Sequence, residues 1–273
     1  MIKNRILFYF LGSFFFFTSL ANAQEINTDS LLKKQNFREE IKDHTPGILK
    51  SAAVGIEYQV KAGIAIGGMS PIPLAPQIRE IKGYNPLLNI SIEGNITKMF
   101  NNFGVSLGLR LETKGMKTKA RVKEYNITMI AEDKGSLSGV FTGIVETEVS
   151  NSYLTIPALA VWEASPRWRI KLGPYCSYLL SGDFSGKTYD GYLREGNPTG
   201  EYVEITSATY DFSSDLRKWN WGAQLGGEWK AFPHLSVSLD LTWGFNSIFK
   251  KDFDVITFDM YPIYGTLGFG YIF

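Results

Sequence analysis

Hydrophobic and polar residues alternate one by one through most of the chain after about residue 54. The segment from Leu235 to Phe249 shows this pattern. Its apolar positions are Leu235, Val237, Leu239, Leu241, Trp243 and Phe245, and its polar positions are Ser236, Ser238, Asp240, Thr242 and Asn246. Successive side chains of a strand point to opposite faces, so a period of two predicts a β-strand with one apolar and one polar face. The period alone does not decide which face meets water.

Seven further segments alternate in the same way, so the pattern predicts eight strands. They span residues 54–66, 88–96, 105–112, 152–163, 168–178, 219–230, 235–249 and 260–273. The fourth is apolar on both faces and contains Pro157, which has no N–H for a ladder hydrogen bond. We therefore expect a bulge or weak pairing at Pro157. The eight predicted strands place the chain in the all-β fold class.

The connections between these strands alternate in length. Three are tight turns, in the sequences MFNNF, ASPR and AFPH. Three others are long, at residues 69–86, at about thirty residues around 117–139, and at 183–218, and a shorter one contains KKDFD. Short turns at one end and long loops at the other are typical of outer-membrane barrels, with periplasmic turns and extracellular loops.

Charges of both signs lie on the polar faces of the predicted strands. The ten positions are Glu57, Lys61, Glu93, Arg110, Glu112, Arg169, Lys171, Glu228, Lys230 and Asp240, five acidic and five basic. The lumen of an eight-stranded barrel is just wide enough to be filled by side chains, and charges removed from bulk water there must be paired. The opposite face is free of charge in seven of the eight strands and fits lipid. The sequence therefore predicts an eight-stranded antiparallel up-and-down transmembrane β-barrel with a salt-bridged, closed lumen.

Aromatic residues support the same orientation of the two faces. Trp168, Trp219, Trp221, Trp243, Tyr261 and Tyr271 fall toward strand ends, where interfacial girdles form. At the end GTLGFGYIF, the residues of the lipid-facing register are Leu267, Phe269, Tyr271 and Phe273. This pattern is similar to the C-terminal assembly signal of outer-membrane proteins, so we expect the barrel-assembly machinery as a partner during biogenesis.

The first residues predict export from the cytoplasm. Lys3 and Arg5 precede an apolar run, which ends at the small residues Ala21-Asn22-Ala23. We expect a signal peptide over residues 1–23, a polar periplasmic leader over 24–50 and the barrel domain over 51–273. The predicted location is the outer membrane of a Gram-negative cell, after Sec-type export.

Composition excludes several classes of function. The net charge of +1 gives no electrostatic footprint for nucleic acid, and the single Cys176 excludes an intramolecular disulfide. The two histidines, His44 and His234, fall on the predicted periplasmic side, away from the long loops. We therefore expect no enzyme activity and no catalytic residues. Two distant histidines and one cysteine form no ligand cluster, so neither a metal site nor a cofactor is expected.

A family resemblance rests on three segments. They are SYLTIPALAVWEASPRWRIKLGPYCSYLLSG at Ser152 to Gly182, the early strand GIEYQVKAGIAIG and the terminal GFGYIF. The Tyr-Leu-x-Ile-Pro motif at Tyr153 to Pro157, followed by Gly-Pro-Tyr at Gly173 to Tyr175, resembles the PorT-type outer-membrane β-barrel family of Bacteroidota-like bacteria. The resemblance implies a small closed barrel, with one branch of the family tied to type IX secretion and gliding.

These observations predict a monomer surrounded by outer-membrane lipid, with a structural or interaction role and a protein partner at its extracellular loops. Two alternatives remain open. The first is a component of a secretion or surface-assembly machinery. The second is a soluble, periplasmic lipocalin-like barrel that binds an apolar ligand, which requires the Leu and Trp face to point inward.

Overall fold

The computed structural model describes residues 55–131, 135–194, 199–253, 255–256 and 258–273. The predicted signal peptide and polar leader lie outside the described residues. The strands are β1 (Ile56–Pro71), β2 (Ile78–Pro86), β3 (Asn89–Phe100), β4 (Phe103–Ala131), β5 (Gly135–Ser165), β6 (Trp168–Arg194), β7 (Tyr202–Asp211), β8 (Trp219–Phe232), β9 (Leu235–Gly244) and β10 (Met260–Ile272). A short 3-10 helix, η2 (Ser213–Asp215), precedes β8. The all-β prediction is confirmed.

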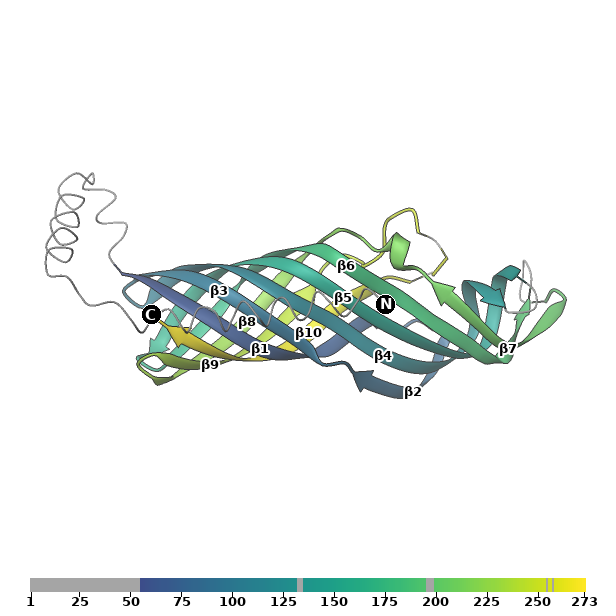
Figure 1. Cartoon of the computed structure of the whole chain (residues 1–273), viewed down its shortest axis with the longest axis horizontal. Helices are drawn as coiled ribbons and strands as arrows, with labels where there is room; N and C mark the ends of the chain where they lie inside the picture. Colours follow the sequence, from purple (N-terminus) through teal and green to yellow (C-terminus); the bar gives the residue numbers. More distant parts are fainter. Residues whose placement is uncertain (1–54, 132–134, 195–198, 254, 257) are drawn as a thin grey trace, which may run out of the picture. The chain divides into compact units, whose positions relative to one another are not determined.

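Eight of these strands form a ring of antiparallel pairs in the order β1, β3, β4, β5, β6, β8, β9 and β10, and β10 pairs with β1 (Figure 1). They are the eight strands that the alternation predicts. The register can be followed around the ring from each residue to its ladder partner on the next strand. Starting at Ile66 of β1, the successive partners are Gly265, Leu241, Leu225, Leu172, Ala160, Val105, Lys98 and Ile56. One circuit thus returns to β1 displaced by ten residues (66 minus 56), which requires tilted strands.

The three tight turns lie together at one end of the ring, which we call the short-turn end. They connect β3 to β4, β5 to β6 and β8 to β9, as predicted. Pro157 lies in the middle of β5 with its side chain buried. The ladder between β5 and β4 has the pairs Ala158↔Leu107 and Thr155↔Arg110 with none between them. Pairing is therefore interrupted at the proline, and Gly108 leaves the room that its ring occupies.

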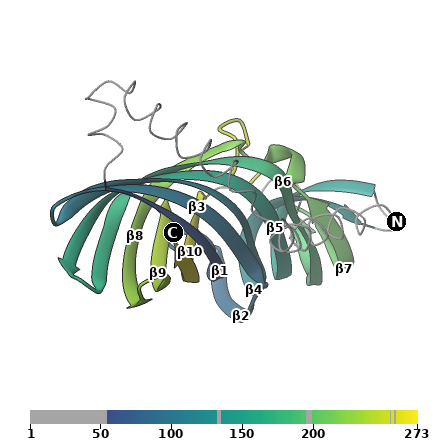
Figure 2. The ribbon, with the colours of Figure 1, turned by 60° about the vertical axis from the view of Figure 1, so that its left-hand side comes forward.

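The prediction of long loops is wrong for most of their length. Strands β4, β5 and β6 continue past the ring, and β7 pairs with β6 along ten residues and with the end of β4. We call residues 116–131, 135–149, 184–194 and 202–211 the extension; in Figures 1 and 2 it lies beyond β8, β9 and β10. Strand β2 lies along the β4 side of it, from Pro86↔Met116 to Ile78↔Val122.

A bulge explains why the alternation did not reveal the extension. The register between β4 and β5 shifts between Val122 and Tyr125, and Glu124 has a φ of 55°. Before the bulge the even-numbered side chains of β4 are buried or half-buried, and after it the odd-numbered ones, Tyr125, Ile127 and Met129, are buried. A period-two pattern that changes phase in mid-strand no longer indicates one continuous strand.

The two faces of the ring point as the charge argument requires. The Leu239 side chain is 65% exposed on the outside of β9, whereas its neighbours Ser238 and Asp240 are buried. Aromatic rings gather outside at both ends of the ring. At the short-turn end Trp168 stacks on Trp229, and at the other end Trp221 and Trp243 each contact Phe245. The lipocalin-like alternative needs the apolar face inside and is therefore wrong.

No helix among the described residues is long and apolar enough to cross a bilayer.

Candidate functional site

The lumen at the short-turn end contains a chain of six ion-paired residues, which we call the first ion-pair chain. Its members are Glu57, Glu163, Arg169, Lys171, Glu228 and Lys230. The Arg169 guanidinium lies 2.5 Å from Glu57 and 2.9 Å from Glu163, and the Lys171 ammonium lies 2.8 Å from Glu228. The Arg169, Lys171 and Glu228 side chains are almost completely buried. Three acids thus balance three bases.

A second ion-pair chain, also of six residues, lies further from the short-turn end than the first and is also neutral. Its members are Asp240, Lys61, Glu93, Arg110, Glu112 and Lys114, in the order of their contacts. The Lys61 ammonium lies 3.1 Å from Glu93 and 3.4 Å from Asp240, and Arg110 pairs with Glu93. At the far end the Lys114 ammonium lies 3.0 Å from Glu112. All six side chains are buried.

Uncharged side chains bind to both chains and fix their geometry. The Gln59 amide donates to Glu228 Oε2 at 2.9 Å and accepts from Asn95. The Arg110 guanidinium donates to Gln224 Oε1 at 2.8 Å, and the Gln224 amide donates to Asp240 at 3.0 Å. Charges held in this way in a low-dielectric interior need every partner, because a half-satisfied network is unfavourable.

All ten charged residues predicted to face the lumen lie in these two chains. The sequence analysis missed two members, Lys114 and Glu163. Both lie an even number of residues from neighbours that face the lumen. Lys114 follows Arg110 and Glu112 at steps of two, and Glu163 lies two residues after Val161. Lys114 was missed because β4 was predicted to end at residue 112.

Lys114 marks the upper limit of the charged lumen. Its ammonium lies over three tyrosine rings, 5.6 Å from the centroid of Tyr153, 5.3 Å from Tyr175 and 5.7 Å from Tyr264. Each ring presents its negative face to the cation, an interaction that strengthens when water is excluded. We call these four residues the tyrosine cage. The tyrosines come from β5, β6 and β10, so the cage reaches across the barrel.

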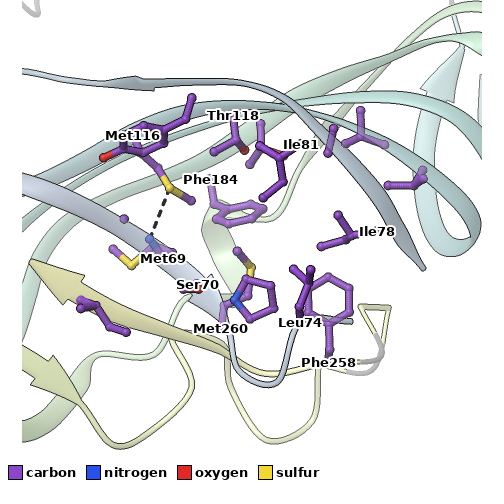
Figure 3. Close-up of a pocket in the computed structure, with 18 of the residues that line it drawn as sticks. Met69, Ser70, Leu74, Ile78, Ile81, Met116, Thr118, Phe184, Phe258 and Met260 are labelled. Atoms are coloured by element: carbon purple, nitrogen blue, oxygen red, sulfur yellow. Dashed lines mark hydrogen bonds between the residues drawn. The ribbon is translucent and has the colours of Figure 1, made fainter. Parts of the chain in front are cut away.

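Above the tyrosine cage the interior becomes apolar and contains a cavity of about 440 Å³. Figure 3 shows Met69, Met116, Met260, Phe184 and Phe258 around it. Met116 is two residues beyond Lys114 on the same face of β4, and its sulfur accepts from the Met69 amide at 3.3 Å. Several of the residues that line the cavity belong to a buried apolar cluster that extends through the upper barrel and the extension.

The buried apolar cluster continues into the extension, whose exterior is polar and aromatic. Phe141 and Leu193 are completely buried in it, and Gly143 and Gly191 leave the room that the Phe141 ring fills. On the outside the Arg194 guanidinium stacks on two rings, 5.1 Å from Tyr192 and 5.6 Å from Tyr202. The Tyr192 and Tyr202 rings contact each other edge to face.

A second group on the outside joins Lys119, Tyr189 and Glu146. The Lys119 ammonium lies 5.0 Å from the Tyr189 ring, and the Tyr189 hydroxyl donates to Glu146 at 3.4 Å. We call this group together with Arg194, Tyr192 and Tyr202 the tyrosine patch.

The remaining predicted residues do not converge on a reactive site. His234 lies in the turn before β9, where its Nδ1 is 2.9 Å from the Ile272 carbonyl oxygen and its ring stacks on Tyr271. Cys176 is exposed on the outer face of β6. Leu267, Phe269 and Tyr271 of the predicted assembly signal are exposed along β10. Across the described ranges, no three His, Cys, Asp or Glu side chains group closely enough to hold a metal ion.

A family model described as an outer membrane protein beta-barrel domain matches residues 34–250 of the chain. Among solved structures, Ail, the attachment invasion locus protein of Yersinia pestis, is 13% identical, with 80% of this chain and 98% of that chain covered and a TM-score of 0.36. Outer membrane protein W of E. coli is 15% identical, with 80% and 97% covered and a TM-score of 0.31. The protein OprG of Pseudomonas aeruginosa is 14% identical, with 80% and 95% covered and a TM-score of 0.26. No curated protein matches the chain.

Proposed function

The chain belongs to the outer membrane protein beta-barrel family, and from this premise we propose that it is a monomeric barrel with a closed lumen that binds a protein partner through its extension. Its location is the outer membrane of a Gram-negative cell, with lipid around the ring. The extension stands at the extracellular end, because short turns lie at the periplasmic end of such barrels.

The proposal of a closed lumen rests on the two neutral ion-pair chains. Twelve charged side chains fill the interior of the ring, and the last of them, Lys114, contacts the three rings of the tyrosine cage. An eight-stranded barrel of this size has an interior just wide enough for its own side chains. An open pore would need hydrated charges, whereas here Glu93, Arg110 and Glu228 are each at most 3% exposed.

Conductance tests the closed lumen directly. The protein is inserted into planar bilayers, and single-channel current is recorded for the wild type and for a Lys114→Gly variant that opens the tyrosine cage. We expect no ohmic current from the wild type. Discrete, reproducible conductance steps from correctly folded wild-type protein would contradict a closed lumen.

The interaction role is supported by the form of the extension. A surface loop without a partner needs no core of its own, whereas here strands β4 to β7 bury Phe141, Leu193 and Ile205 and hold the tyrosine patch in place. Arginine and tyrosine are enriched at the energetic centres of protein interfaces. A rigid surface of this composition loses little conformational entropy on binding.

Site-specific photo-crosslinking on living cells tests this role. A photoreactive amino acid replaces Tyr202 in the tyrosine patch, and Arg167 in the periplasmic turn serves as the matched control. We expect a discrete crosslinked protein from position 202 that is absent from position 167. Abolition of the same adduct by Arg194→Ala would assign it to the patch, and equal crosslinking at both positions would contradict the proposal.

A second candidate is a PorT-type component of a secretion or surface-assembly machinery. The observation that favours it is the convergence of the two motif segments: Pro157 pairs with Tyr175, and Tyr153 and Tyr175 both lie on Lys114. Deletion of the gene tests this role. Loss of type IX secretion restored by the wild-type gene supports it, and normal secretion of all cargo in the deletion strain contradicts it.

We further propose that the chain has no catalytic chemistry and that β10 is the assembly signal. The position of His234 in a tight turn at the short-turn end, away from the extension, with its ring bound to the Ile272 carbonyl oxygen, supports the first statement. The outward aromatic register of Phe269, Tyr271 and Phe273 supports the second. Phe273→Ser should slow assembly into the membrane, with unfolded protein collecting in the periplasm.

A further inference from the structure

The wall of the barrel has a break above the ring, between β1 and β2. Strands β1 and β3 pair only as far as Ala65↔Asn89, and the end of β1 from Ile66 to Pro71 has β10 as its ladder partner. Strand β2 pairs with β4 instead. Across the described part of the chain, no ladder joins β1 to β2. The hydroxyl of Tyr84 on β2 spans the break and donates to the Gly67 carbonyl at 2.7 Å.

The cavity above the tyrosine cage lies behind this break. Its lining includes Gly67, Gly68 and Met69 from β1, and Ile78, Ile81 and Tyr84 from β2. The far wall is formed by Met116 and its neighbours on β4 and by Phe184 on β6 (Figure 3). The cavity therefore borders on both strands that flank the missing ladder.

The break lies at the outer edge of the membrane. Gly68 pairs with Ile263, and Ile263 pairs with Trp243 of the outer aromatic group. Around it are exposed apolar side chains, with Leu74 57%, Ile81 60% and Tyr84 48% exposed. Elsewhere on the same extracellular section exposed charged pairs such as Lys117 and Glu148 are common, although Ile130 and Tyr202 are exposed there too. An apolar rim on a charged surface marks contact with an apolar partner or lipid.

The chemistry of the lining selects an uncharged ligand. None of the described residues that line the cavity is charged. Two of its hydroxyl groups are engaged: that of Tyr84 donates to the Gly67 carbonyl, and Thr147 Oγ1 lies 2.6 Å from the Tyr210 hydroxyl. Burial raises the pKa of Tyr125 well above its ordinary value, so this lining residue stays neutral. An anion or cation entering the cavity would lose its hydration without gaining a partner.

Size and flexibility favour a chain-like molecule. A dry, apolar cavity of about 150 Å³ is large enough for benzene, and this one is about three times larger. Three methionines, Met69, Met116 and Met260, line it, and their unbranched thioethers adapt to ligands of differing shape. Below Met116 the tyrosine cage and the ion-pair chains occupy the lumen, so the cavity ends blindly.

We propose that this cavity binds an uncharged amphiphile with a single hydrocarbon chain, such as a fatty alcohol, which enters sideways from the outer leaflet through the break between β1 and β2. The alkyl chain lies among the methionines and the head remains near the Tyr84 hydroxyl. The protein holds the molecule and does not pass it to the periplasm. The proposal is independent of whether the tyrosine patch binds a protein.

Photoaffinity labelling in lipid nanodiscs tests the site without detergent, whose alkyl chains would compete. The probe is dodecanol with a diazirine on its chain, and labelled peptides are mapped by mass spectrometry. We expect saturable labelling of the peptides that contain Met69, Ile81 and Met116, with competition by plain 1-dodecanol. Ionised dodecanoate should compete poorly because none of the described residues of the lining is a cation.

Two tryptophan variants separate the cavity from the lipid surface. Ala120→Trp fills the cavity, and overfilling of this kind should weaken labelling by about tenfold or more. Ala160→Trp adds the same side chain on the outer face of β5 and should leave labelling unchanged. Both variants are first shown to be folded by heat-modifiable migration on a gel. Equal labelling of folded Ala120→Trp and wild type, or labelling that never saturates, overturns the site.

The route is tested by the rate of labelling. Tyr84→Phe removes the hydrogen bond that joins β2 to β1 across the break, worth about 1 kcal/mol, so probe entry should become about fivefold faster. Tyr178→Phe is the matched control, since this tyrosine lies exposed on the outer face of β6 against the Trp219 ring and away from the break, and it should show the wild-type rate. An unchanged rate in Tyr84→Phe with saturable binding intact overturns the lateral route and assigns entry to the extracellular end.

Discussion

The inner face of β4 differs completely between its lower and upper halves. Inside the ring it presents Arg110, Glu112 and Lys114, while above the ring it presents Met116 and Val122, all buried. The outer face changes in the opposite sense, from exposed Leu109 and Leu111 to exposed Arg121 and Lys123. One strand therefore exchanges its apolar and polar faces within a few residues, between Lys114 and Met116.

This exchange of faces marks the level at which the surroundings of the protein change from lipid to water. Lipid surrounds the lower half, so the outside must be apolar and the polar side chains are left for the interior. Water surrounds the upper half, so the ordinary rule of an apolar core returns. The interiors of the two halves consequently differ in what they contain, paired charges below and apolar side chains above. Each of the following experiments separates the two.

The largest effect is expected from Arg110→Met in the lower half. Arg110 pairs with Glu93 and Glu112 and donates to Gln224, so its loss leaves buried carboxylates without a partner. Removing one member of a buried ion pair typically costs about 3–5 kcal/mol. Urea unfolding in lipid vesicles, followed by tryptophan fluorescence, measures this. The control Lys117→Met breaks an exposed pair of the extension and should cost less than about 1 kcal/mol; similar costs for the two would contradict the distinction.

A loss of similar size but local extent is expected from Phe141→Ala in the upper half. The Phe141 side chain is completely buried in the extension, and deleting such a ring costs about 3–5 kcal/mol. Because β8 and β9 contribute no residue to the buried cluster that contains Phe141, hydrogen exchange should quicken in the tips of β4 to β7 and not in β8 and β9. Equally faster exchange in β9 would show that the two halves unfold as one unit.

A smaller effect is expected from arginine on the outer face, and its size should depend on the half. Leu239→Arg places the charge in lipid and should cost about 2–4 kcal/mol. Ile130→Arg places it on the water-exposed face of the extension, where surface changes stay within about 0.5 kcal/mol. Unfolding free energies of both variants in the same vesicles provide the comparison. Equal costs would mean that residue 130 also lies in lipid.

The smallest effect on stability is expected from lowering the pH. Asp211, at the end of β7, accepts hydrogen bonds from the Ser213 hydroxyl and amide, and these hold the pKa of its carboxyl below its ordinary value of 3.8. A lowered pKa in the folded state means that the contribution is present above pH 3.8 and is lost as the pH falls further. For so exposed a group it is worth about 0.5 kcal/mol or less. The protection factors of the β7 amides, which correct for the intrinsic slowing of exchange in acid, should fall below pH 3.8 in the wild type and should not fall in this way in Asp211→Asn.

Sequence reasoning located the eight ring strands because lipid on one side and a packed lumen on the other impose a strict period of two. It identified ten of the twelve lumen charges for the same reason. It did not find the extension, because the bulge at Lys123 and Glu124 changes the phase of the pattern and Asp190 on β6 adds another positive φ, of 50°. It did not find the cavity either, since its lining comes from β1, β2, β4, β5, β6 and β10.

The sequence by itself determined the strands of the ring, the even balance of charge on one face and the apolar character of the other, because each of these depends on neighbours at a spacing of two. Only the tertiary structure decided which charges pair, since Lys61 meets Asp240 across 179 positions of the chain. It also decided that three tyrosines from distant strands meet at Lys114. The break beside β1 has the same origin, because whether a strand finds a second partner depends on where the rest of the chain has already paired.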